Sequence, residues 1–138
     1  MAIYQTITES FKKELFEGVH DFSTDTIQIA LYTSSASIDA STTTYTTAGE
    51  TSGAGYVAGG AVLVVVGVFL SNGVAFVDFE NVSWPGSNFS CRGALIYNSS
   101  KANKSIAVLD FGSDKTASGN FEVQFPAGNS TSAILRFV

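Results

Sequence analysis

Charged residues are scarce in this sequence, and their scarcity limits what the chain can bind. Only 14% of the 138 residues are charged, and the formal net charge is −5. Nucleic-acid backbones are bound by clusters of Lys and Arg. The closest basic pairs, Lys12–Lys13 and Lys101–Lys104, do not form a basic stripe. We therefore expect no nucleic-acid partner.

Cysteine and histidine occur once each, as Cys91 and His20. A single cysteine excludes an intrachain disulfide and a cysteine-rich metal site. The first 15 residues, MAIYQTITESFKKEL, also lack a basic leader followed by an apolar region, so they do not read as a secretion signal. We expect synthesis in the cytoplasm and no cofactor.

A long apolar segment is missing as well. The run at 61–70 is about half the length of a membrane-spanning helix, so we expect no membrane partner. The glycines at 52–60 are not followed by the lysine of a phosphate-binding loop, and the β-branched residues after them favour a strand. The pattern predicts a glycine-rich turn and a strand buried on both faces, with a hairpin at 71–73.

One amphipathic helix is predicted near the N-terminus, at residues 2–17. Ile3, Ile7, Phe11 and Leu15 recur every four residues, and Gly18 follows where a helix cap is expected. A helix this short needs a partner, so we expect it to pack on a sheet.

The apolar period changes to two near residue 25. Short strands are predicted at 26–33, 73–84, 88–98, 104–112, 119–125 and 132–138, and a long polar loop at 34–54. This pattern predicts a mainly β chain: one domain over residues 1–138, a β-sandwich or barrel-like arrangement of short antiparallel strands.

The chain is also expected to assemble with copies of itself. Segments 61–70, 73–80 and 104–111 are apolar on both faces, and neighbouring subunits could cover what one chain leaves open. The contacts are assigned to the loop at 34–54, including Tyr45, and to the helix face bearing Glu9, Lys12 and Lys13. Trp84 is a further candidate interface anchor.

No catalytic set is predicted. His20 follows the helix and adjoins Asp21, but neighbours in sequence need not form a hydrogen bond, and a turn role is the simpler interpretation. Cys91 alternates with apolar neighbours and is expected in the core. Asp110 and Asp114 flank a turn that could bind calcium or simply bond its own backbone.

Several phrases together resemble small virion structural proteins of tailed bacteriophages. They are FKKELFEGVHDFSTDTIQIALYTSS, ETSGAGYVAGG, VSW, RGALIYNSS and AVLDFGSDKTASGNFEVQFP; the run at 62–70 departs from the expected alternation. The resemblance implies a non-enzymatic virion protein, most specifically a capsid decoration or cement protein that binds the major capsid protein. The alternatives are a phage tail or adaptor component and a glycan-binding β-sandwich module with an exposed aromatic near Trp84 or Tyr56.

Overall fold

The computed structural model describes residues 2–137 as two antiparallel sheets and one short helix. The mainly β prediction is confirmed, and the strands form two separate sheets rather than one closed sheet. In chain order the elements are β1 (Thr6–Ile7), α1 (Glu9–Phe16), β2 (Ile27–Tyr32), β3 (Ala61–Leu63), β4 (Val65–Ser71), β5 (Val74–Phe79), β6 (Val82–Asn98), the 3-10 turn η1 (Ser99–Lys101), β7 (Lys104–Val123) and β8 (Leu135–Phe137).

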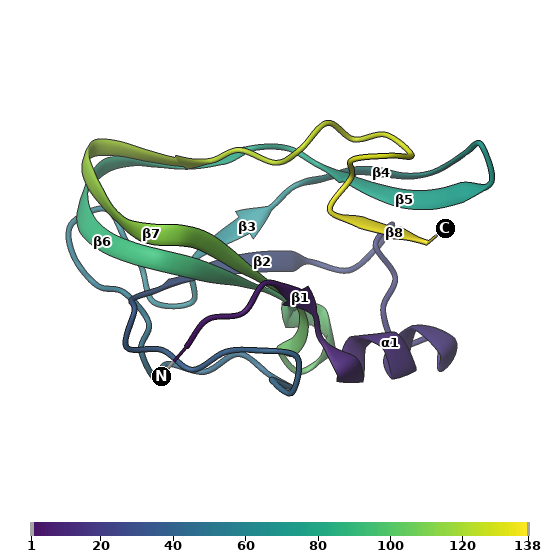
Figure 1. The fold of residues 1–138 in the computed structure, drawn as a ribbon, viewed down its shortest axis with the longest axis horizontal. Coiled ribbons are helices and arrows are strands. Elements are labelled where there is room, and N and C mark those ends of the chain that lie inside the picture. Colours follow the sequence, from purple (N-terminus) through teal and green to yellow (C-terminus); the bar gives the residue numbers. More distant parts are fainter. Residues whose placement is uncertain (1, 138) are drawn as a thin grey trace.

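A long hairpin of β6 and β7 dominates the first sheet, whose strand order is β1-β7-β6-β2-β3. The sequence predicted strands at 88–98, 104–112 and 119–125 here, and one at 73–84 that the structure divides between β5 of the second sheet and the start of β6. They are joined into two because β-bulges at Pro85/Ser87 and Cys91/Gly93 interrupt the apolar alternation without ending the pairing. The hairpin bends so that its two halves lie one above the other (Figure 1), and the main apolar core lies between them.

The second sheet has the order β4-β5-β8. Asn72 and Gly73 form the predicted hairpin turn between β4 and β5, with φ of 53° and 76°. Positive φ at both positions is what a two-residue hairpin of this kind requires. The sheet lies at the opposite end of the molecule from the bend of the long hairpin, above α1 (Figure 1).

The N-terminal helix is shorter than predicted. The expected helix at 2–17 is wrong for its first half, because Ile3 bridges to Ile38 and β1 pairs with β7. A four-residue repeat is also a multiple of the strand period, so the same isoleucines fit an extended chain. From Glu9 onward the prediction is confirmed: Phe11 is buried, and Gly18 follows the helix with φ of 73°.

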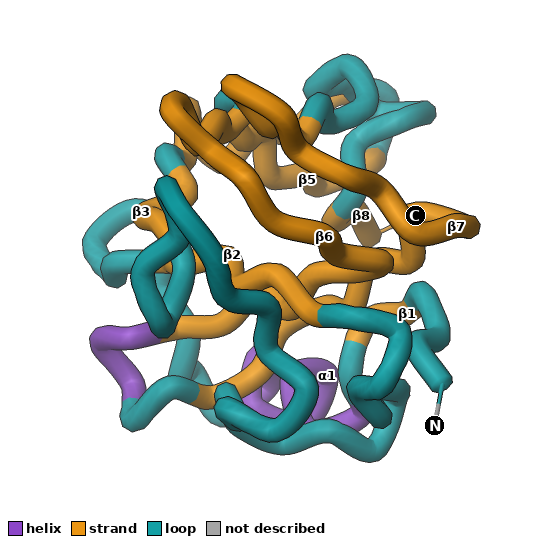
Figure 2. Tube along the Cα trace, turned by 90° about the vertical axis from the view of Figure 1, so that its left-hand side faces the viewer, coloured by secondary structure: helices purple, strands orange, loops and turns teal. Residues whose placement is uncertain are grey.

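The loop at 34–54 covers the outer face of the first sheet. Ile38 and Ala36 are buried in a second apolar cluster with Tyr32, Leu95 and Val108. Loop segments pass below the strands on the side where α1 also lies (Figure 2). The predicted burial of 104–111 on both faces therefore holds for residues 105–109, and the chain's own loop supplies the cover that we assigned to a neighbouring subunit.

The glycine-rich stretch has the architectural role that the sequence predicted. A Cβ on Gly60, whose φ is 85°, would lie 1.8 Å from the carbonyl oxygen of Ile29, and one on Gly53 would lie 2.4 Å from that of Asn88. The loop backbone therefore rests directly on β2 and β6, and only glycine permits that approach.

The apolar run after these glycines differs from its prediction. It divides at Val64 between β3 and β4, which belong to different sheets. β4 is not buried on both faces: Val66, Val68, Phe69 and Leu70 are exposed. The expected burial of this strand is thus not achieved within a single chain.

Candidate functional site

Three predicted contact residues lie on the exposed side of α1. Glu9, Lys12 and Lys13 are all exposed, and Lys13 forms an ion pair of 2.7 Å with Glu17 one turn later. Because both partners face water, this pair contributes little stability. The face is therefore accessible to a partner.

Tyr45 is half-buried and makes its polar and stacking contacts within its own chain. Its ring stacks on Tyr97, with 4.9 Å between centroids, and its hydroxyl donates to Glu50 at 2.6 Å. The same carboxylate accepts hydrogen bonds from the Tyr56 hydroxyl and the Gly59 backbone. Glu50 thus ties two parts of the 45–60 segment together, a role that the sequence analysis did not foresee.

The loop that carries Tyr45 is attached to β7 at several points. The backbone N–H of Tyr45 donates to Asn103, the N–H of Ser105 donates to Thr43, and the Ser105 hydroxyl donates to the Thr42 carbonyl at 2.7 Å. This segment is consequently part of the folded sheet. The expectation that 34–54 is a free polar loop, which becomes ordered only when it contacts a partner, is wrong.

Trp84 is 4% exposed and lies in the main core. Its ring neighbours are Tyr56 and Phe121, at 6.4 and 6.1 Å between centroids. A side chain buried to this extent cannot anchor a partner or stack on a sugar in this conformation. Of the two aromatics that the glycan-binding alternative named, Tyr56 is half-buried and its hydroxyl is bonded to Glu50.

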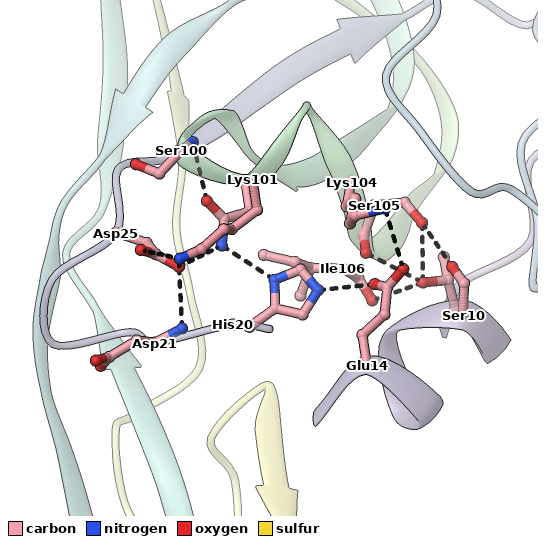
Figure 3. A network of polar contacts seen from close by, with 12 residues as sticks. Ser10, Glu14, His20, Asp21, Asp25, Ser100, Lys101, Lys104, Ser105 and Ile106 are labelled. Atoms are coloured by element: carbon pink, nitrogen blue, oxygen red, sulfur yellow. Dashed lines mark hydrogen bonds and ion pairs between the residues drawn. The ribbon is translucent and has the colours of Figure 1, made fainter. Parts of the chain in front are cut away.

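A polar network surrounds His20 (Figure 3). His20 Nε2 lies 2.8 Å from Glu14, and Nδ1 lies 3.0 Å from the amide nitrogen of Asn98. That amide also donates to Asp25 at 2.8 Å, and Lys101 donates to both oxygens of Asp25. The network joins the end of α1, the following turn and the tip of the β6–β7 hairpin.

The network leaves no free histidine nitrogen. Because the Asn98 amide is a donor, Nδ1 accepts, and Nε2 carries the proton that is donated to Glu14. The His20 side chain is fully buried. Both nitrogens therefore serve the fold, in line with the turn role predicted for this residue, and neither faces a space that a substrate could enter.

Asp25 is the carboxyl group whose pKa is shifted most by its surroundings. Burial raises its pKa, but hydrogen bonds from Lys101, Asn98 and the Asp21 backbone outweigh burial and lower the pKa from 3.8 to about 2. The side chain is 6% exposed. Asp25 is thus a charged anchor for the chain leaving α1.

Cys91 and the acidic turn complete the set of residues considered for chemistry. Burial raises the pKa of the Cys91 thiol to about 12, so the reactive thiolate is scarce near neutral pH. Asp110 accepts from the backbone of Gly112 at 2.8 Å, as the simpler interpretation of that turn predicted. Over residues 2–137 no three His, Cys, Asp or Glu side chains gather as metal ligands would.

An apolar surface on the second sheet is the strongest candidate for a binding site. Its exposed members are Val64, Val66, Val68, Phe69 and Leu70 in and beside β4, and Phe137 in β8. Leu70 is 76% exposed and Phe137 is 58% exposed. We call these six residues the β4 surface. Exposed apolar side chains gathered in this number usually mark contact sites on soluble proteins.

An apolar cleft of about 220 Å³ adjoins this surface, between α1 and the second sheet. Phe11 and Leu15 line it from the helix, and Val68, Leu135 and Phe137 line it from the strands. Lys12 also lines the cleft, so the helix face predicted to make contacts lies beside the β4 surface. The sequence indicated the helix face and the apolar run, but it did not show that the two lie next to each other.

Comparisons with protein-family models, curated proteins and solved structures found no match to this chain. In the described part of the chain, no helix is both long and apolar enough to cross a membrane.

Proposed function

We propose that this chain is a non-enzymatic structural protein of a tailed-phage particle, most specifically a capsid decoration protein. It acts by binding copies of itself and the major capsid protein, and its place of action is the virion. The phage assignment rests on the sequence phrases that resemble virion structural proteins. The assembly role is carried by one observation, the exposed β4 surface.

The distribution of polar groups supports a role in binding rather than in catalysis. His20 has both ring nitrogens bonded within the chain, and the Cys91 thiol is buried. The apolar cleft between α1 and the second sheet is lined by aliphatic and aromatic side chains, with Lys12 and Arg136 as its charged members. A cleft of this composition suits an apolar contact, and it lacks the paired acid and base that hydrolysis needs.

Repeated contacts suit a decoration protein because a shell offers many equivalent sites. Weak apolar contacts add together on a symmetric lattice, so no single contact has to be strong. The charged helix face of Glu9, Lys12 and Lys13 is accessible and would orient the chain on the capsid, because charges improve encounter and register more than affinity.

Quantitative mass spectrometry of purified particles, followed by electron microscopy that locates the chain, tests this proposal. A decoration protein is present in numbers comparable to the major capsid protein and lies on the head. A few copies at one end of the particle would instead support the tail or adaptor alternative. Absence from the particle would refute a virion role, and binding to a glycan array would then be the next measurement.

The helix face has its own test in a particle-binding assay. The double substitution Lys12→Glu and Lys13→Glu should reduce binding to heads that lack the chain. Lys115→Glu, at an exposed position of β7, is the matched control and should bind as the native chain does. Equal binding by all three proteins would remove this face from the contact.

A further inference from the structure

The outer edge of β4 has no strand beside it among the described residues. β4 pairs only with β5, and it forms one edge of the second sheet. Folded proteins commonly protect such an edge with Lys, with Pro or with a covering segment. The chain from 51 to 77 contains neither a charged residue nor a proline. This edge is therefore open to another strand.

The backbone groups that face outward follow from the hairpin register. Residues of an antiparallel pair alternate between hydrogen-bonded and non-hydrogen-bonded positions. The pair that flanks the two-residue turn is hydrogen-bonded, and so is the pair Phe69–Phe76 two residues further on. The N–H and C=O groups of Val68 and Leu70 consequently point away from β5.

The side chains at this edge are apolar on both faces. Val68 and Leu70 share one face with Ala75 and Phe137, whereas Phe69 lies on the other face against Phe76, with 5.6 Å between ring centroids. The exposed apolar area of the β4 surface is on the order of 600 Å², at the upper end of the range for a monomer. Phe137 lies in β8, two strands from this edge, so a second β4 edge would contact the five residues in and beside β4.

We infer that the β4 edge binds the β4 edge of a second copy of this chain, in antiparallel register about a twofold axis at Phe69. Val68 of each copy then pairs with Leu70 of the other copy, and the two pairs together form about four backbone hydrogen bonds. The two Phe69 side chains face each other at a non-hydrogen-bonded position, where side chains lie closest. The two sheets become one continuous sheet.

A second copy fits this edge better than a charged partner does. Each chain has a net charge of −5, so two copies repel except where both surfaces are uncharged, as they are here. The other free edge, β8, is three residues long and contains Arg136, which makes it a poorer template. A contact between identical edges also closes as a dimer, whereas β4 against β8 would extend into a fibre.

This inference deepens the proposed assembly role and rests on it for its biological purpose, but its test needs only the purified chain. The variant Phe69→Cys places a thiol on the proposed axis, where paired Cα atoms are about 4.5 Å apart and a disulfide can form. Oxidation with diamide should convert most of the chain to a covalent dimer. Cys91 is buried and should not react.

Ser71→Cys is the matched control in the same strand. In the proposed register its two copies are separated by about four residues, roughly 13 Å, which is beyond the reach of a disulfide. Dimer from Phe69→Cys alone supports the register. Equal cross-linking at both positions, or none at position 69, overturns it. A native chain that sediments as species larger than a dimer would instead indicate pairing of β4 with β8 and would also overturn it.

A second measurement does not depend on the cysteine variants. Leu70→Lys adds a charge at the edge, and sedimentation should show at least a tenfold weaker dimer. Val57→Lys replaces an exposed valine outside β4 and should leave the dimer unchanged. A native chain that sediments as a monomer at high micromolar concentration refutes the inference. If that monomer still binds phage heads, the proposed function stands without it.

Discussion

Removing the charge of Asp25 should make the stability of this protein less dependent on pH. Asp25 joins the turn after α1 to Lys101 and Asn98 at the tip of the long hairpin. Its pKa is lowered from 3.8 to about 2 in the folded chain. A lowered carboxyl pKa stabilises the folded state above the unfolded pKa, and that contribution is lost as pH falls through the folded pKa.

The size of the change in unfolding free energy follows from the pKa shift of Asp25. At 1.36 kcal/mol for each pKa unit, the shift from 3.8 to about 2 is worth about 2 kcal/mol at pH 7. The same linkage leaves about 1 kcal/mol at pH 3 and little at pH 2. Because asparagine resembles the protonated acid, Asp25→Asn should be about 2 kcal/mol less stable than the native chain at pH 7, and the difference should halve at pH 3.

Urea unfolding followed by the fluorescence of Trp84, the one tryptophan of the chain and a buried one, measures both values. Asp114→Asn, at an exposed position of β7, is the control and should leave the urea midpoint unchanged at either pH. Lys101→Met should reproduce most of the loss at pH 7. A difference between Asp25→Asn and the native chain that stays constant or grows from pH 7 to pH 3 would refute the ion-pair reasoning.

Three other predictions concern the packing of the loops and the core. Gly60→Ala should lower the free energy of unfolding by more than about 2 kcal/mol because its Cβ meets the Ile29 carbonyl, whereas Gly86→Ala, with φ of 64° and open space around it, should cost about 1 kcal/mol. Tyr45→Ala should expose the 34–54 loop to limited proteolysis, whereas the native chain should resist cleavage there. Cys91 should react with a thiol reagent only after unfolding, and labelling of the folded chain would show that it opens locally.

The strand content could be predicted from the sequence because alternation is a local signal. The predicted strand 26–33 matches β2 to within a residue at each end. The predicted turn at 71–73 joins β4 and β5 in a hairpin. The start of the helix could not be placed, because Ile3 and Ile7 satisfy both periods and pairing with distant strands decided between them. Long-range contacts of this kind leave no local mark.

The candidate site was predictable only in part. The exposed helix face followed from the helical period. Tyr45 and Trp84 were predicted to contact a partner, but Tyr45 is hydrogen-bonded to Glu50 and Trp84 lies in the core. Sequence periodicity shows that a residue alternates with polar neighbours, and it does not show what covers it. Glu50, bonded by two tyrosines and a backbone amide, had no sequence signal, because a single acid in a polar loop is ordinary.

The two sheets differ in whether another part of the chain covers their apolar residues, and the difference favours an assembly role. The first sheet covers its outer face with residues 34–48, at the cost of ordering a long segment of the chain. Within residues 2–137 no comparable segment covers β4 of the second sheet, although its residues are as apolar as those of the covered strands. Exposed apolar strands promote aggregation, so a chain that buries one sheet with its own loop and leaves β4 open is consistent with a surface that a partner covers. The partner that we propose for this surface is a second copy of the chain.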